Sequence, residues 1–319
     1  MNRSGAFCGA LALAAVGCGD SPVSPTPGNQ GSWDTLAPMP AARQELASAV
    51  LNGLIYVIGG YDSAGQSTNS VFVYNPSANT WSTAAPLPIV NNHGAAAVAN
   101  GRLFAFGGVS NRAFVYNPGA NSWSEVASMN VEHGNTAAVA VINNRIYVAG
   151  GTGGTQREVE AYDAIGNTWT LLAPMNVGRN HCAGGAIGGR FYVVGGRGFG
   201  DSDVAVEVYD PAANNWTSLT PMPTGRSGIG AGVVNNRLYV FGGEIPSIHN
   251  ESRIVRPGGE HVAAAFAHAD AQARHLGVGH REHDLPARWR NGSGPGCDRQ
   301  HGVVHRPLTC SMILVSSPV

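Results

Sequence analysis

Short apolar runs recur along the chain, and each of them ends at a pair of glycines. The runs hold three to five residues, among them Leu54–Ile58, Phe191–Val194 and Leu238–Phe241. Their length and their content of Val, Ile, Tyr and Phe are typical of β-strands rather than helices. The glycine pairs, which end strands where a Cβ does not fit, are Gly59-Gly60, Gly107-Gly108, Gly150-Gly151, Gly195-Gly196 and Gly242-Gly243.

Tryptophans recur in step with the glycine pairs. Successive pairs are 48, 43, 45 and 47 residues apart, and successive tryptophans are 48, 42, 46 and 47 residues apart. The tryptophans are Trp33, Trp81, Trp123, Trp169 and Trp216. A turn of the type Tyr-(Asn/Asp)-Pro, followed by Asn-x-Trp, leads into most of them. A fixed period of this length indicates a repeated supersecondary unit.

These coinciding registers resemble the Kelch repeat family over about Trp33 to Glu251. The resemblance implies a β-propeller in which each repeat of roughly 45–50 residues forms one four-stranded blade. We therefore predict an all-β fold, a Kelch propeller with six blades in the intact ancestor and an incomplete ring in the chain as written. The chain supplies four complete units, a partial fifth, and a strand at Trp33 that would complete the last blade.

The composition and charge of the chain argue against a basic surface that would bind nucleic acid. Charged residues make up 12% of the chain, about half the usual share of roughly 25%. The formal net charge is −1, and all nineteen basic residues are arginines. No basic stripe runs through the repeats, which argues against nucleic acid as a partner.

The first residues predict export. Residues 1–18 combine a basic start with an apolar run too short to span a bilayer, as in a signal peptide. Ala15–Cys18 resembles a bacterial lipobox, in which Cys18 would be lipidated. Residues 19–31 form a Pro/Ser/Gly-rich tether. We expect an exported, membrane-anchored lipoprotein of the bacterial cell envelope, periplasmic or at the cell surface. The alternative is an ordinary secretory signal cut near the same place.

The sequence divides after the repeats, into residues 32–251 for the propeller and 252–319 for a tail of different composition. The tail holds seven of the eleven histidines and eight of the nineteen arginines. Read one nucleotide later, it permits a sixth repeat, with a Trp at the codon of Val262 and a Gly pair at Arg288-Trp289. Our hypothesis is a single-base insertion or deletion near Ser252 to Ile254. The alternative is an authentic, disordered His/Arg-rich extension, whose histidines have no scaffold to hold a metal.

One position per repeat is a candidate for ligand binding. The fourth residue past the Met or Leu of each repeat is expected to lie in a ring at one mouth of the central channel, and these residues are Arg43, Asn91, His133, Arg179 and Arg226. Arginines there suit carboxylates or acidic peptides, because a guanidinium binds a carboxylate with two hydrogen bonds. The alternative is that they bond carbonyls of neighbouring blades. His93, His133 and His181 are expected near the same mouth in neutral polar contacts, without a metal.

The function that we predict is binding rather than catalysis. No nucleophile elbow, phosphate-binding loop or paired-carboxylate motif is present, and no cofactor is implied. Some Kelch propellers are enzymes, such as galactose oxidase-like proteins, but no tyrosines match their copper ligands. Cys182 follows His181 and is expected to be buried and inert. We predict a non-catalytic interaction module whose loop face binds a protein or a glycan, and which meets a membrane only through its lipid anchor. The alternatives are a periplasmic or surface enzyme acting on a sugar or acid, and a product without function as written.

Overall fold

Antiparallel four-stranded sheets account for nearly all the regular structure. The computed structural model describes residues 36–152, 154–198, 200–244, 252–255 and 261–262, all within the unit that begins at Trp33. These residues form strands and turns and no helix, so none of them lies in a helix long and apolar enough to span a bilayer. The predicted signal peptide with Cys18, the predicted tether, Trp33 and most of the tail lie outside the described residues.

Five sheets follow one another along the chain, each built from strands that are consecutive apart from one short insertion. The first sheet contains β1 (Ala47–Leu51), β2 (Leu54–Ile58), β3 (Val71–Asn75) and β4 (Thr80–Ala84). The second contains β5 (Gly94–Ala99), β6 (Arg102–Gly107), β7 (Ala113–Asn117) and β8 (Ser122–Val126). The third contains β9 (Ala138–Ile142), β10 (Arg145–Ala149), β11 (Val159–Asp163) and β12 (Thr168–Leu171). The fourth contains β14 (Ala183–Ile187), β15 (Arg190–Val194), β17 (Val206–Asp210) and β18 (Asn215–Ser218), and the fifth contains β19 (Gly230–Val234), β20 (Arg237–Phe241), β21 (Ser252–Val255) and β22 (His261–Val262).

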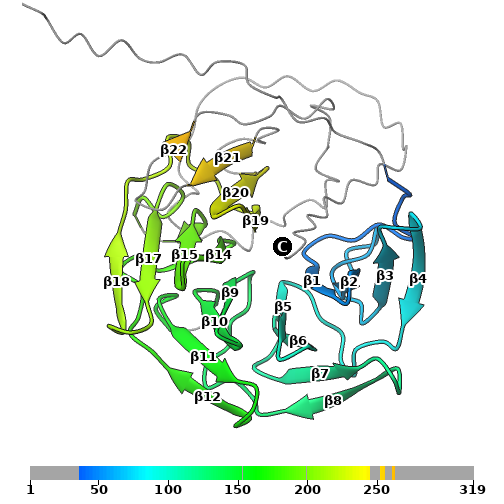
Figure 1. Cartoon of the computed structure of the whole chain (residues 1–319). Helices are drawn as coiled ribbons and strands as arrows, with labels where there is room; N and C mark the ends of the chain where they lie inside the picture. The colour runs from blue at the N-terminus through cyan, green and yellow to red at the C-terminus, as the bar shows by residue number, and fades with distance from the viewer. Residues whose placement is uncertain (1–35, 153, 199, 245–251, 256–260, 263–319) are drawn as a thin grey trace, which may run out of the picture. The chain divides into compact units, whose positions relative to one another are not determined.

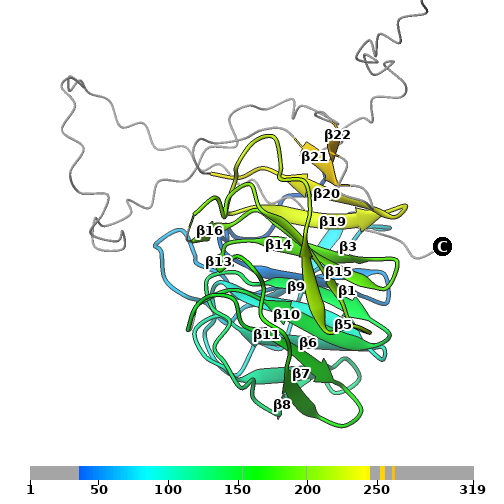
Figure 2. The same ribbon diagram turned by 90° about the vertical axis from the view of Figure 1, so that its left-hand side faces the viewer.

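The sheets are arranged as the blades of a propeller. Their first strands β1, β5, β9, β14 and β19 lie innermost and side by side, and their fourth strands lie outermost (Figure 1). Figure 2 shows the same order from the side, with β19, β14, β9 and β5 following one another down the view. A short pair, β13 (Arg179–Asn180) with β16 (Arg197–Gly198), joins two loops of the fourth sheet. The all-β, incomplete Kelch-type propeller predicted from the repeat is confirmed.

The predicted strands match the observed ones closely. Each glycine pair directly follows or overlaps the end of a second strand, and the apolar run Leu54–Ile58 coincides with β2. The innermost strands β5 and β9 consist largely of alanine and valine, whose side chains are small. The four described tryptophans lie in the outer strands β4, β8, β12 and β18. Small side chains let the inner strands converge, while the larger side chains fill the wider spaces between blades.

The fifth sheet continues past Glu251, the residue at which the repeat motif ends in the sequence. Ser252–Val255 pairs with β20, and His261–Val262 pairs in turn with Ser252–Val255. Both strands come from the segment that the sequence assigned to the tail. An unpaired strand edge offers its N–H and C=O groups to any extended chain, whatever the side chains. Backbone pairing therefore continues the fifth sheet past the point where the repeat motif ends.

A repeated latch joins the second, third and fourth sheets to the sheet before each of them, and joins the first sheet to the segment that precedes it. In the second sheet, the Trp123 indole donates to the Ala85 carbonyl at 2.9 Å, and Asn121 Oδ1 accepts from the Ala85 N–H at 2.8 Å. Asn121 Oδ1 also accepts from the Tyr116 hydroxyl at 2.7 Å. Equivalent triads clamp Ala37, Ala127 and Ala173, and they are Tyr74–Asn79–Trp81, Tyr162–Asn167–Trp169 and Tyr209–Asn214–Trp216. The Tyr-turn-Trp motif of the repeat is thus an inter-blade clamp as well as core.

The hydrophobic core lies between adjacent sheets rather than within one. One cluster joins Tyr56 and Val73 of the first sheet to Leu103, Phe114 and Tyr116 of the second. The Met or Leu four residues before each candidate ring position is buried in every repeat, and these residues are Met39, Leu87, Met129, Met175 and Met222. Burial of such side chains anchors the segment that leads into each inner strand.

Candidate functional site

Four of the five residues predicted to line the channel mouth are buried. Asn91 is 5% exposed, His133 is 1% exposed, and Arg179 and Arg226 are fully buried, whereas Arg43 is partly buried. Each of them precedes the first strand of its sheet, as the repeat spacing predicted. Their side chains, however, point into the protein.

These side chains bond to the sheet that they lead into. Arg226 donates to the Gly242 carbonyl at 2.9 Å, and Arg179 to the Val193 carbonyl at 3.2 Å. His133 Nδ1 donates to the Gly150 carbonyl at 2.6 Å. The remaining two also bond within their own sheets, Asn91 Oδ1 accepting from the Val109 N–H and Arg43 donating to the Ser70 hydroxyl. The alternative in the sequence analysis was that these arginines bond carbonyls of neighbouring blades. Arg179 and Arg226 do bond carbonyls, but these carbonyls belong to the arginine's own blade. Ligand binding by the five residues stays a prediction.

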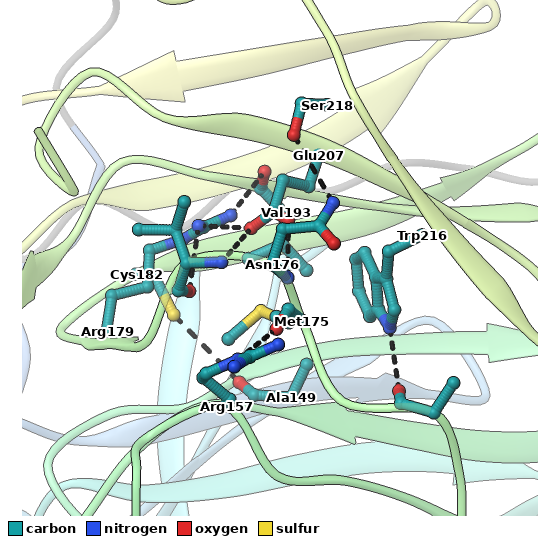
Figure 3. Close-up of polar contacts among 12 residues, drawn as sticks. Ala149, Arg157, Met175, Asn176, Arg179, Cys182, Val193, Glu207, Trp216 and Ser218 are labelled. Carbon is teal, nitrogen blue, oxygen red and sulfur yellow. Dashed lines mark hydrogen bonds and ion pairs between the residues drawn. The ribbon is translucent and has the colours of Figure 1, made fainter.

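Two buried glutamates, which the sequence analysis missed, hold the same segments from the third strands. Glu207 in β17 lies 2.5 Å from the Arg179 guanidinium and accepts from the Asn176 N–H at 2.8 Å (Figure 3). Glu160 in β11 accepts from the Asn130 and Val131 N–H groups, and its carboxylate lies 3.4 Å from His133 Nε2.

The charge of Glu160 is stabilised by these hydrogen bonds. Burial acts to raise the pKa of Glu160, but the bonds from His133, Asn130 and Val131 outweigh it, so the pKa lies below its ordinary value. The first and second sheets carry Phe72 and Phe114 at the positions of Glu160 and Glu207. A comparison of the repeats could have found the two glutamates, because each stands at a third-strand position that other repeats fill with phenylalanine.

The ring that joins successive sheets lies two residues further along each repeat. It consists of Glu45, His93, Asn135, His181 and Gly228, which all have positive φ angles between 49° and 61°. The His93 N–H donates to the Glu45 carbonyl at 2.8 Å, and the His181 N–H donates to the Asn135 carbonyl at 2.8 Å. The chain of bonds continues from the Gly228 N–H to the His181 carbonyl at 3.0 Å. Direct bonds between neighbouring repeats place these residues where the sheets converge.

Their side chains form a polar group that we call the axial cluster, comprising Glu45, His93, His181, Arg197 and Glu244. The His93 and His181 ring centroids are 5.1 Å apart in an edge-to-face arrangement. Glu45 Oε2 lies 3.6 Å from His93 Nε2. Arg197 donates to His181 Nε2 at 2.6 Å and contacts Glu244 at 2.7 Å. Of the three histidines expected near the mouth, His93 and His181 therefore meet, while His133 points into the third sheet.

Asparagines fix the tautomers of both axial histidines. His93 Nδ1 lies 2.5 Å from Asn92 Oδ1, and His181 Nδ1 lies 2.6 Å from Asn180 Oδ1. Because an amide oxygen only accepts hydrogen bonds, each Nδ1 carries the proton. Each neutral ring then presents the lone pair of Nε2 to the axial cluster.

The surroundings of His93 favour the neutral ring. Burial lowers the pKa of His93 below its ordinary value, the Glu45 and Glu244 carboxylates oppose this shift, and the Arg197 cation adds to it. The unfolded chain takes up a proton at His93 near the ordinary pKa of about 6.5, whereas the folded protein resists until a lower pH. Between those two pKa values the unfolded state binds more protons, so stability falls as the pH falls.

We expect the variant His93→Asn to lose less stability than the parent between pH 7 and pH 5. Asn is the residue at the equivalent position 135, so it fits the positive φ angle. Urea unfolding at both pH values, in the presence of a chelator, gives the comparison. Groups such as Glu45, Arg197 and Glu244 face the ring in parent and variant alike. An equal loss of stability in the two proteins would contradict the assignment.

A surface depression lies beside the third and fourth sheets. Its volume is about 770 Å³, and its lining includes Thr155, Arg157, Asn176 and Asp201. These residues belong to the β10–β11, β12–β13 and β16–β17 loops. Thr155, Asn176 and Asp201 are exposed, and Arg157 is partly buried and donates to the Met175 carbonyl at 2.5 Å (Figure 3).

Cys182 has no role in the axial cluster. It is a free, buried thiol whose Sγ lies 3.9 Å from the Ala149 carbonyl. Burial raises the pKa of Cys182 above its ordinary value. The expectation that Cys182 is buried is confirmed, and a raised pKa disfavours the reactive thiolate.

Comparisons with known proteins agree with this architecture. An F-box/kelch-repeat protein of Arabidopsis thaliana is 43% identical over 49 residues, which are 15% of this chain and 13% of that protein. The solved structure named "Structure of YjhT" matches with a TM-score of 0.65 and 21% identity, covering 73% of this chain and 87% of that one. At that identity the likeness shows the fold alone.

The strongest statement comes from a family model. The family described as the Attractin/LZTR1 beta-propeller matches residues 29–243, well over half of the chain. That range takes in all the described second-strand glycine pairs and the tryptophan latches. The chain belongs to this family of kelch-type β-propellers.

Proposed function

We propose that this chain is a non-catalytic interaction module that is exported to the cell envelope and binds a protein or glycan partner through its loop face. The Kelch-repeat propeller itself suggests a protein-interaction module. Export rests on the signal-like start and the lipobox-like Cys18. The depression lined by Thr155, Arg157, Asn176 and Asp201 is the observation that carries the binding role.

The chemistry of the depression suits a polar chain. Its lining includes Gly154, Gly178 and Gly200, and it offers one cation and one anion in Arg157 and Asp201. Loops on a rigid sheet scaffold are the usual carriers of binding residues. By contrast, the five residues predicted for the channel mouth form bonds within their own sheets.

A photo-crosslinking amino acid placed at Thr155 or at Asp201 tests this role in cells. Ile165 is the matched control, because it is 85% exposed in the β11–β12 turn at the opposite end of the third sheet. We expect both loop-face positions to cross-link to the same partner and Ile165 to give no such product. The same product from Ile165, or no product from either loop position, would overturn the proposal.

An enzyme acting on a sugar or an acid is the second candidate. The observation in its favour is the axial cluster, where the Glu45 carboxylate faces the neutral His93 ring beside Arg197. A carboxylate and a neutral imidazole can each accept a proton from a bound substrate, as a general base does. Loss of turnover in the variant Glu45→Gln, with cross-linking at Thr155 unchanged, would favour this candidate.

A further inference from the structure

Three repeats bring metal-binding atoms together on the axis. Glu45, His93 and His181 each offer one ligand atom, and these atoms all lie within 4.8 Å of one another. The spacing of these residues did not point to a metal site, because neither His93 nor His181 has another histidine two or four residues away. The fold supplies the proximity, since the three residues occupy equivalent positions in the first, second and fourth repeats.

The backbone holds these positions firmly. All three residues have φ angles of 49° to 51°. The His93 N–H bonds to the Glu45 carbonyl, and the His181 N–H bonds to Asn135, which belongs to the same ring. Zinc binds His nitrogen and carboxylate oxygen at about 2.0–2.2 Å. The His93–Glu45 separation of 3.6 Å already suits a shared ion, and side-chain rotation closes the remaining distance to His181.

The histidines carry the protonation state that a metal requires. Asn92 and Asn180 accept from the two Nδ1 atoms, which leaves both Nε2 lone pairs directed at the cluster. A hydrogen bond from the remote ring nitrogen is the usual support of a metal-bound histidine. Neither histidine would have to give up a proton to bind.

Arg197 competes for the site. It donates to His181 Nε2 at 2.6 Å, the atom that a metal would use. Its other guanidinium nitrogen contacts Glu244 at 2.7 Å, and its side chain is 32% exposed. Arg197 can therefore leave His181 and remain paired with Glu244. The structure thus contains the three ligands and an arginine cation that occupies the position of the metal ion at His181.

We propose that Glu45, His93 and His181 bind one divalent transition-metal ion of the zinc class, in competition with Arg197. Two imidazoles and one carboxylate are typical ligands of zinc, and open positions would remain for water or an exogenous ligand. The site is independent of the loop-face role, and it lies on different residues.

Titration calorimetry of the full-length chain with Zn²⁺ tests the proposal. The variants are His93→Asn, which copies Asn135, and Glu45→Gln, whose parent side chain is 29% exposed. We expect His93→Asn to lose one bound equivalent and Glu45→Gln to bind that equivalent about 10–100-fold more weakly. Arg197→Gln is expected to tighten it. Histidines of the tail are present in every variant, so they cancel in the comparison.

Thermal unfolding gives a second readout. Zn²⁺ should raise the Tm of the parent and of Arg197→Gln more than that of His93→Asn, since an ion bound only to the folded state stabilises it. Circular dichroism of each variant establishes that the sheets are intact. Equal stoichiometry and affinity in the parent, His93→Asn and Glu45→Gln would overturn the proposal. So would an Arg197→Gln variant that binds Zn²⁺ more weakly than the parent.

Discussion

Replacing Arg179 with Met is expected to lower the free energy of unfolding by about 3–5 kcal/mol, because it removes one partner of a buried ion pair. Arg179 is fully buried, Glu207 is 1% exposed, and their charged atoms are 2.5 Å apart. The variant leaves the Glu207 carboxylate buried, where it still accepts hydrogen bonds from the Asn176 and Val177 N–H groups. A typical domain has a stability of about 5–15 kcal/mol, so this is a large share. Urea unfolding followed by tryptophan fluorescence measures it.

Arg190→Met is the matched control for this prediction. Arg190 pairs with Asp210 in the same sheet at 3.1 Å, but its side chain is 55% exposed. An exposed pair contributes about 0–1 kcal/mol, so the control variant should unfold close to the parent. A double variant, Arg179→Met with Glu207→Phe, should recover part of the loss, since β3 carries Phe72 at that position. Equal effects of Arg179→Met and Arg190→Met would contradict the assignment.

Replacing Gly151 with Ala is expected to lower the free energy of unfolding by about 2–5 kcal/mol. Its φ angle is 93°, and an added Cβ would lie 2.6 Å from the Gly134 carbonyl oxygen and 3.0 Å from the His133 carbonyl carbon. A left-handed conformation costs an L-residue about 1–2 kcal/mol, and overpacking adds about 1–3 kcal/mol. The atoms in the way are backbone atoms of the segment that leads into the first strand of the same sheet, so they cannot rotate aside.

Two other glycines separate these contributions. Gly188 has a φ angle of 57° and nothing within 4 Å of its Cβ position, so Gly188→Ala should show the conformational part alone. Gly119 has no positive φ angle, and its nearest neighbour lies at 3.4 Å, so Gly119→Ala should leave stability nearly unchanged. Urea unfolding of the three variants should rank Gly151 above Gly188 and Gly188 above Gly119. Any other order would refute the packing argument for the glycine pairs.

The fold was predictable because its determinants are local. Glycine pairs end the second strands where backbone from the next repeat passes close to the chain, as the Arg179 carbonyl does at Gly150. Tryptophans mark the outer strands since their indoles reach the preceding sheet, as Trp123 reaches Ala85. The last two strands were not predictable in this way. They pair with the fifth sheet through main-chain groups, which leave no side-chain pattern to recognise.

The candidate site was predictable only to within two residues. Every residue of a repeated loop has the same spacing from repeat to repeat, so the period cannot tell which of them faces the axis. The chain bends at Glu45, His93 and their equivalents, where φ is positive. This bend turns Arg179 into its own sheet and His181 toward the axis. Burial of Arg179 beside Glu207 could be inferred only once β17 was placed next to β15.

The inter-blade latch has a consequence for how the chain is made. Its indole bonds join residues 44, 38, 42 and 43 positions apart. Each of the first three sheets is clasped by the tryptophan of the sheet synthesised directly after it. As the polypeptide leaves the ribosome, a blade can therefore lock once about one more repeat has emerged. Because no latch spans more than about one repeat, assembly of these sheets can proceed in the order of translation.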